Sequence, residues 1–105
     1  MALLFLVGCA AHRELNPKEK YFMARSTFND AVVQYMAFAN SQTPEVVAKM
    51  KTEVNPVIKS AEKALDAWGN AMGSGDENAK INTYLSIKDE MISLFLKYGL
   101  TIKEE

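Results

Sequence analysis

The sequence contains little cysteine, little histidine and almost no net charge. Of its 105 residues one is Cys and one is His, and 12 Lys and Arg balance 13 Asp and Glu, for a net charge of −1. A single Cys excludes a disulfide framework within the chain, and one Cys with one His cannot form a four-ligand zinc site. A nucleic-acid-binding protein usually carries a basic excess, which is missing here. The apolar content of 49% excludes a charged disordered tail, and the length indicates one small domain.

Charge is also missing from the start of the chain. Met1 to Ala11 contains no charged residue, and the first charge is Arg13. A helix needs roughly 20 apolar residues to cross a bilayer, about twice the length of this run. The run instead has the length of the apolar region of a secretory signal peptide, roughly 7–15 residues. We therefore expect residues 1–8 to be a signal peptide that is cleaved.

The apolar run ends in the motif Leu6-Val7-Gly8-Cys9. This motif resembles the lipobox of bacterial lipoprotein precursors, which has an aliphatic residue, a small or aliphatic residue, Gly or Ala, and then Cys. The resemblance implies diacylglycerol transfer to the Cys9 sulfur, cleavage between Gly8 and Cys9, and acylation of the new amino terminus. Two acyl chains give stable membrane anchoring, whereas one chain binds only marginally.

The residues around the motif bear on where the protein is located. Ala10 follows Cys9, and by resemblance to enterobacterial lipoproteins this favours the outer membrane, facing the periplasm, over inner-membrane retention. The segment 1–8 departs from lipoprotein signals because it contains no Lys or Arg. The alternative interpretation is a soluble helical adaptor protein, with a phage-linked role as one branch, in which Cys9 is a buried free thiol, since unpaired Cys is among the most buried residue types.

The rest of the sequence predicts three amphipathic helices, the first over about residues 17–40. Asn16 is a favoured N-cap, Pro17 suits the first helical position, and Glu19 completes a capping-box pattern. Apolar residues then recur at a spacing of three and four, which places them on one helix face. These residues are Tyr21, Ala24, Phe28, Ala31, Tyr35 and Phe38, and Val32, Met36 and Ala39 widen the stripe.

The second helix is predicted over about residues 44–72, after a Thr43-Pro44 start. Pro56 lies inside it, and an interior Pro removes a backbone hydrogen bond. The helix could restart at Asn55-Pro56 after a tight break. Because the apolar spacing continues through the Pro without a slip, we favour one helix kinked at Pro56. The regular positions are Val47, Met50, Val54, Val57, Ala61, Ala64, Trp68 and Ala71.

The third helix is predicted over about residues 77–98. Ser74 and Glu77 fit another capping box, and Gly99 stands where a left-handed C-cap residue belongs. Lys88 interrupts the apolar stripe, so we expect its stem to lie at the core edge with the ammonium group in water. The stripe residues are Ile81, Tyr84, Leu85, Met91, Ile92, Phe95 and Tyr98.

These elements predict an all-α fold, an antiparallel three-helix bundle over residues 17–99 whose middle helix is kinked at Pro56. Residues 9–16 would be the lipidated amino terminus and a short linker, and residues 100–105 a frayed tail. Stripes this regular also allow a longer helical hairpin that pairs with a partner. The methionines fit the stripes, so we expect them to fill the core, although they could form an adaptable surface.

No constellation in the sequence predicts catalysis, a cofactor or a metal site. His12 lacks a nearby nucleophile other than Cys9, which acylation would consume. On the second helix Glu62 and Asp66 share a face, but Lys59 and Lys63 alternate with them, which is typical of a solvated surface. The same applies to Glu53 and to Asp89-Glu90. Trp68 is expected in the core, and the four tyrosines at the bundle margin, because a buried hydroxyl needs a partner.

The sequence therefore predicts a small non-enzymatic envelope lipoprotein, either structural or partner-binding, anchored through Cys9 to membrane lipid. The body resembles the small helical lipoproteins of bacterial and prophage genomes, a resemblance that implies no activity. A possible envelope protein is the one partner expected besides lipid, with no nucleic acid and no small-molecule substrate.

Overall fold

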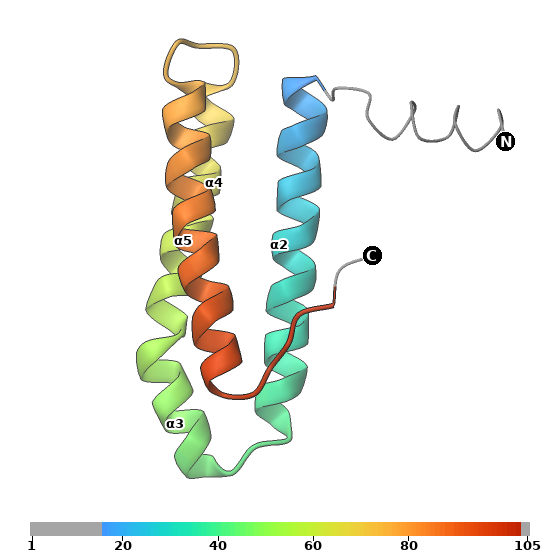
Figure 1. Cartoon of the computed structure of the whole chain (residues 1–105), viewed down its shortest axis with the longest axis vertical. Helices are drawn as coiled ribbons and strands as arrows, with labels where there is room; N and C mark the ends of the chain where they lie inside the picture. Colours follow the sequence, from blue (N-terminus) through green and yellow to red (C-terminus); the bar gives the residue numbers. More distant parts are fainter. Residues whose placement is uncertain (1–15, 104–105) are drawn as a thin grey trace, which may run out of the picture.

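The computed structural model describes residues 16–103, and within this range the chain is helical with no strand. The helices are α2 (Pro17–Asn40), α3 (Pro44–Glu53), α4 (Asn55–Ala71) and α5 (Glu77–Lys97). Because α3 and α4 are the two halves of one bent helix, the described residues form three helices, as expected (Figure 1). Their ends agree with the predicted ends to within one residue, apart from the break between α3 and α4.

The starts of the first two helices follow the capping residues. At α2 the backbone N–H of Glu19 donates to Asn16 Oδ1 at 2.8 Å, and the backbone N–H of Asn16 donates to Glu19 Oε1 at 3.1 Å. These two bonds make the predicted capping box. At α3 the N–H of Val46 donates to Thr43 Oγ1 at 3.3 Å. Side chains close to each helix therefore satisfy backbone donors that the helix itself leaves free.

The middle helix bends at Val54, two residues before Pro56. Val54 keeps right-handed helical angles, with φ −91° and ψ −43°, so the two halves are joined without a loop. Pro56 has no N–H, and its ring would collide with the carbonyl of Thr52 in a straight helix. The N–H groups of Val57 and Ile58 both donate to the Val54 carbonyl, each at 3.0 Å. The predicted kink is thus confirmed.

The start of α5 differs from the prediction. Ser74 does not form the predicted capping box, because its hydroxyl donates to the carbonyl of Ala71 at 2.6 Å and accepts from the N–H of Asp76 at 3.2 Å, not from that of Glu77. The cap position is Asp76, which makes no side-chain capping bond. The Glu77 carboxylate instead accepts from Trp68 Nε1 at 3.3 Å and from the N–H of Gly73 at 3.1 Å. A tertiary partner, Trp68, thereby replaces the local one that the pattern predicted.

The end of α5 agrees with the prediction. Gly99 has φ +97°, in the left-handed region that glycine adopts without strain. The N–H of Leu100 donates to the Phe95 carbonyl and that of Gly99 to the Leu96 carbonyl, both at 2.9 Å, which is the Schellman pattern. The chain then turns back, and Gln34 and Lys103 exchange two hydrogen bonds. Lys103 is thereby tied to α2, and Leu100 and Ile102 pack against the core, so the expectation of a frayed tail is wrong for these residues.

The core is formed by the predicted stripes of all three helices. Among its members only Leu65 lies outside those stripes, while two residues assigned to the stripes, Met36 and Leu85, are 59% and 44% exposed. The core residues are Phe28, Ala31, Tyr35, Met50, Val54, Ala61, Ala64, Leu65, Trp68, Tyr84, Met91 and Phe95.

Ring contacts join the helices. The rings of Tyr21 on α2 and Trp68 on α4 meet edge to face, with centroids 5.6 Å apart. The rings of Tyr35 on α2 and Phe95 on α5 are stacked, with centroids 5.2 Å apart. Trp68 also contacts Tyr84 of α5 at 6.0 Å. Each helix thus shares aromatic contacts with the others, and the described residues form a helical bundle.

Candidate functional site

The predicted lipidation site lies outside the described residues. Gly8, Cys9 and the lone His12 all precede Asn16, where the description of the chain begins. The predicted signal cleavage and acylation therefore remain predictions. In the range 16–103, no helix combines the length and the apolar character that a membrane span requires.

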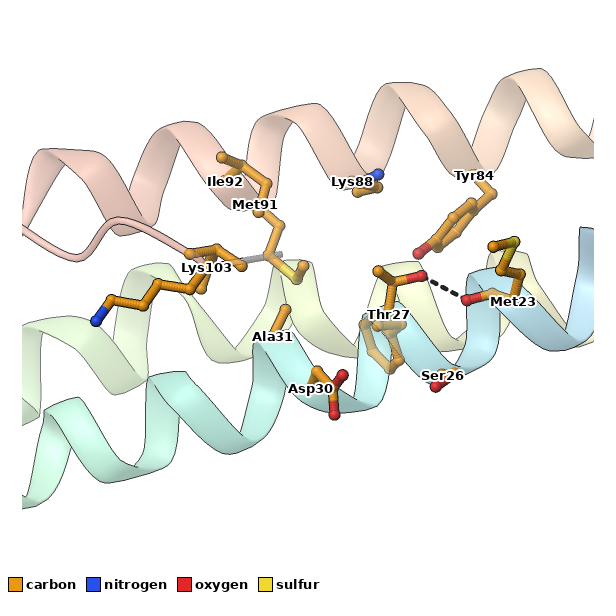
Figure 2. A pocket seen from close by; sticks show the side chains of 12 residues that line it. Met23, Ser26, Thr27, Asp30, Ala31, Tyr84, Lys88, Met91, Ile92 and Lys103 are labelled. Atoms are coloured by element: carbon orange, nitrogen blue, oxygen red, sulfur yellow. Dashed lines mark hydrogen bonds between the residues drawn. The ribbon is translucent and has the colours of Figure 1, made fainter. Parts of the chain in front are cut away.

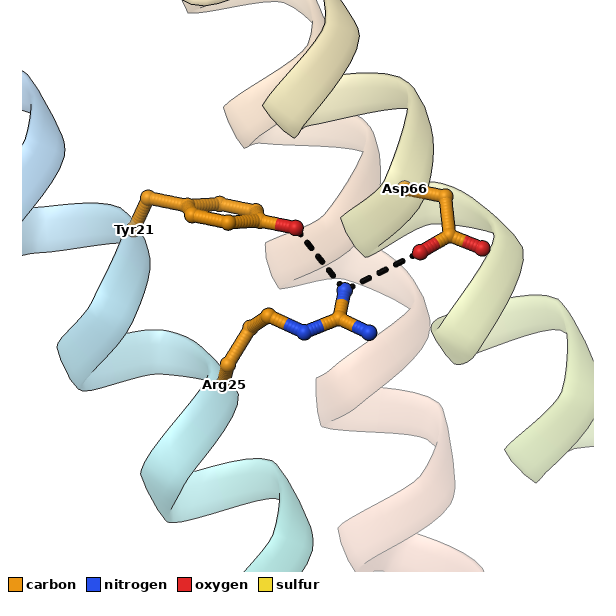
Figure 3. Close-up of polar contacts among 3 residues, drawn as sticks. All are labelled: Tyr21, Arg25 and Asp66. Atoms are coloured by element: carbon orange, nitrogen blue, oxygen red, sulfur yellow. Dashed lines mark hydrogen bonds and ion pairs between the residues drawn. The ribbon is translucent and has the colours of Figure 1, made fainter.

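The acidic residues of the middle helix form separate contacts and do not make a shared site. Asp66 pairs with Arg25 of α2 at 3.0 Å, and the same guanidinium donates to Tyr21 Oη at 2.9 Å (Figure 3). Glu62 is exposed on the same helix as Asp66, together with Lys59. The sequence pattern did not identify Arg25, because its partner Asp66 lies 41 residues away in the chain. This trio ties α2 to α4.

Glu53 likewise joins two elements. Its carboxylate accepts from Lys97 Nζ at 2.8 Å and from the Tyr98 hydroxyl. The hydrogen bond from Lys97, together with that from Tyr98, lowers the pKa of Glu53 below its ordinary value. In turn the hydrogen bond to Glu53 raises the pKa of Tyr98 to about 12. Since these contacts link residues of α3 and the end of α5, we assign them to the joining of the two helices.

Metal ligands do not converge in the part of the chain that the structure describes. Across residues 16–103, no group of three or more His, Cys, Asp or Glu side chains is placed to hold an ion. Asp89 and Glu90 are both exposed on α5. The arrangement of carboxylates therefore offers no candidate metal centre in this range.

Of the four tyrosines, Tyr21 and Tyr98 are half-buried, as predicted for the bundle margin, and the other two are not. Tyr35 and Tyr84 are buried in the core, with exposed fractions of 6% and 2%. The Tyr35 hydroxyl donates to Asn55 Oδ1 at 3.0 Å, and burial raises the Tyr35 pKa. Burial also raises the pKa of Tyr84, to about 12, against an opposing effect of Arg25. For Tyr35 and Tyr84 the prediction was wrong, because ring contacts, stacked with Phe95 and tilted with Trp68, favour burying both rings.

Tyr84 borders a cleft of about 220 Å³ between α2 and α5 (Figure 2). Phe28, Met91 and Ile92 supply apolar surface, and Lys88 lines the same cleft one turn beyond Tyr84. The other lining residues come from α2 and the C-terminal segment, and are Met23, Ser26, Thr27, Asp30, Ala31, Ile102 and Lys103. The cleft thus combines apolar walls with a small number of polar groups, as ligand sites commonly do.

A second, wider groove of about 640 Å³ lies between α2 and the bent helix. Its α2 side includes Val32, Met36 and Ala39, and its other side includes Val47 and Ile58. The five described methionines lie in three environments: Met50 and Met91 are buried, Met72 is half-buried, and Met23 and Met36 on α2 are about 60% exposed. The expectation that methionines fill the core is therefore correct for only part of them.

Comparison with known proteins adds no relative to this geometry. No protein-family model, no curated protein and no solved structure matches the chain. The candidate sites are therefore the cleft beside Tyr84, the groove beside Met36 and, ahead of the described residues, the Cys9 motif.

Proposed function

We propose that this protein is a small, non-enzymatic lipoprotein of the bacterial cell envelope, with acyl chains on Cys9 and a helical body that serves as a structural or partner-binding module. The observation that carries the proposal is the motif Leu6-Val7-Gly8-Cys9, which ends an uncharged apolar run and contains the single Cys of the chain. A thiol at that position is the nucleophile that lipid transfer requires.

The start of α2 supports anchoring close to the membrane. Asn16 caps this helix seven residues after Cys9, and seven extended residues reach at most about 25 Å at 3.3–3.6 Å each. A body on so short a linker stays at the membrane surface, facing the periplasm if the protein is sorted to the outer membrane. The net charge of −1 provides little electrostatic attraction to anionic lipid, so anchoring depends on the acyl chains.

The outer face of α2 supports the partner-binding part of the proposal. Phe22, Val33 and Met36 are 57%, 63% and 59% exposed. Their separations of 11 and three residues place them on one side of the helix, away from the buried stripe. An apolar row on a surface helix is typical of interaction surfaces. We propose that an envelope protein partner contacts this row.

We also propose that the bundle is antiparallel, with the chain reversing direction at each turn. The path of the ribbon supports this arrangement (Figure 1), together with the stacked Tyr35 and Phe95 rings. Nuclear Overhauser effects between the two rings are the expected result. If Tyr35 contacts another helix of a second molecule instead, isotope-filtered spectra of a mixed labelled and unlabelled sample would detect it.

Metabolic labelling with radioactive palmitate tests the anchoring proposal. The full chain, expressed from its own start in a bacterium, should incorporate label and fractionate with membranes, and Cys9→Ser should abolish both. Ala11→Ser is a matched control, because it makes a small polar change two residues further on and should leave labelling intact. Absence of Cys9-dependent label would overturn the proposal and favour the soluble adaptor with a buried thiol.

A further inference from the structure

The cleft between α2 and α5 holds a tyrosine hydroxyl without a hydrogen bond. Tyr84 is 2% exposed, and its hydroxyl has no partner among the described residues. No fully enclosed side-chain oxygen or nitrogen in that range lacks a partner, so the hydroxyl must reach the cleft. Figure 2 shows the Tyr84 hydroxyl directed from α5 into the space between the helices. A nearly buried donor of this kind has a strong need for an acceptor.

Lys88 supplies a second donor to the same cleft. Lys88 lies four residues after Tyr84 on α5, which puts the two side chains on neighbouring turns of one helix face. Lys88 is half-buried, lines the cleft, and forms no ion pair with another described residue. A cationic donor and a hydroxyl donor that line one cleft favour a negatively charged acceptor.

The remaining polar groups of the cleft do not satisfy these donors. The Thr27 hydroxyl donates to the carbonyl of Met23 in its own helix. Asp30 lies on α2, on the opposite side of the cleft from Lys88, and the nitrogen of Lys103 points away from Tyr84 (Figure 2). Asp30 supplies one negative charge against the two lysines, so the charged side chains of the cleft sum to +1. The donors at Tyr84 and Lys88 remain available to a ligand.

We propose that this cleft binds a small carboxylate with an apolar body. The carboxylate accepts hydrogen bonds from the Tyr84 hydroxyl and the Lys88 ammonium group, and the apolar body lies against Phe28, Met91 and Ile92. This binding function goes beyond the proposed lipid anchoring and does not depend on it, since every residue involved belongs to the helical body.

The size of the cleft limits the ligand. Its volume of about 220 Å³ exceeds the roughly 150 Å³ of an apolar cavity that holds benzene. It is smaller than the roughly 300–1,000 Å³ of pockets for drug-sized molecules. A short fatty acid such as hexanoate fits these limits. For so small a ligand we expect a Kd on the order of 1 mM.

Methionine-methyl NMR of the full chain tests the proposal. Met23 and Met91 line the cleft, whereas Met50 lies in the core between other elements. Hexanoate, added to about 10 mM, should shift the Met23 and Met91 methyl signals in a saturable manner and leave that of Met50 unchanged. The absence of a saturable shift would overturn the proposal and mean that water alone satisfies Tyr84.

Two variants and a neutral probe test the anion site itself. Lys88→Met should raise the Kd about tenfold, and Tyr84→Phe about threefold to tenfold. Lys80→Met is the matched control, because Lys80 is exposed on the same helix and does not line the cleft. Hexanol should bind far more weakly than hexanoate. Equal binding of hexanol, or an unchanged Kd in both cleft variants whose circular dichroism shows them folded, would overturn the assignment.

Discussion

The ring of Tyr21 lies against Gly69 so closely that a Cβ at Gly69 would be 2.8 Å from both Cζ and Oη of Tyr21. The same ring meets Trp68 edge to face, and its hydroxyl accepts from Arg25. Gly69 has little value for the helix itself, since glycine is a poor helix former. Gly69 instead serves the packing of the helices, because the absence of a side chain lets Tyr21 of α2 lie close to the backbone of α4.

Gly69→Ala should destabilise the protein even though it improves helix propensity. Overpacking costs about 1–3 kcal/mol, and replacing a helical glycine by Ala gains about 1 kcal/mol, so the net loss should be on the order of 1 kcal/mol. Urea unfolding followed by the fluorescence of Trp68, the single Trp, measures it.

The Tyr21→Ala background supplies the control for this prediction. Without the ring, Gly69→Ala should stabilise by up to about 1 kcal/mol, because only the propensity gain remains. If Gly69→Ala changed the free energy of unfolding in the same direction in both backgrounds, the Tyr21 ring would not be the reason that position 69 requires glycine.

Glu77→Ala should loosen the turn between α4 and α5. Its carboxylate accepts from Trp68 Nε1 and from the N–H of Gly73, so truncation removes both bonds and leaves a partly buried indole donor unpaired. We expect the free energy of unfolding to fall by about 1–3 kcal/mol. The Trp68 emission should shift at the same time, since its N–H loses its acceptor.

The matched control is Glu90→Ala, on the exposed face of the same helix. It should change the stability by no more than about 0.5 kcal/mol. Equal losses for the two variants would mean that removing a negative charge from α5, and not the contact with Trp68, causes the effect.

Local sequence signals predicted the helices because their causes are local. The Asn16 capping box, the Thr43 cap and the Gly99 termination all involve residues within five positions of one another. The spacing of apolar residues likewise identified eleven of the twelve core residues, all except Leu65. The kink at Pro56 followed from the chemistry of a single residue and from the uninterrupted apolar pattern.

Long-range partners could not be predicted in the same way. Glu77 matched a capping box with Ser74, yet the fold gives it Trp68, nine residues away. Arg25 pairs with Asp66 because α2 packs against α4, and no pattern within a single helix predicts that packing. The cleft needs α2, α5 and the C-terminal segment together. Lys88 was correctly placed at the core edge, but the burial of Tyr84 one turn away was not predicted.

The stability should fall at alkaline pH because of Tyr84. Burial raises its pKa from 10.0 to about 12 in the folded protein. The contribution of the protonated Tyr84 side chain to the free energy of unfolding is therefore complete below pH 10. It is lost as the pH rises towards about 12, because the Tyr84 hydroxyl deprotonates at lower pH in the unfolded chain than in the folded protein. The loss should approach about 2 kcal/mol. Urea unfolding at a series of pH values measures it.

Tyr84→Phe should flatten this dependence, since no hydroxyl remains to titrate. Tyr98, whose pKa is raised to about 12 by its hydrogen bond to Glu53, acts in the same pH range and in the same direction. Tyr98→Phe therefore serves as the second variant, and the two together should remove most of the slope. An undiminished slope in the double variant would contradict the assignment to these tyrosines.

Gln34→Ala should release the C-terminal segment and leave the helices intact. Gln34 Nε2 donates to the Lys103 carbonyl at 2.9 Å, and the Lys103 N–H donates to Gln34 Oε1 at 3.0 Å. Loss of two exposed bonds should cost about 0.5–1.5 kcal/mol and speed amide exchange at Lys103, with core amides unchanged. Asn29→Ala, on an exposed part of the same helix, is the control and should leave Lys103 protected. Equal exchange at Lys103 in both variants would mean that Ile102, which packs against the core, holds the segment without Gln34.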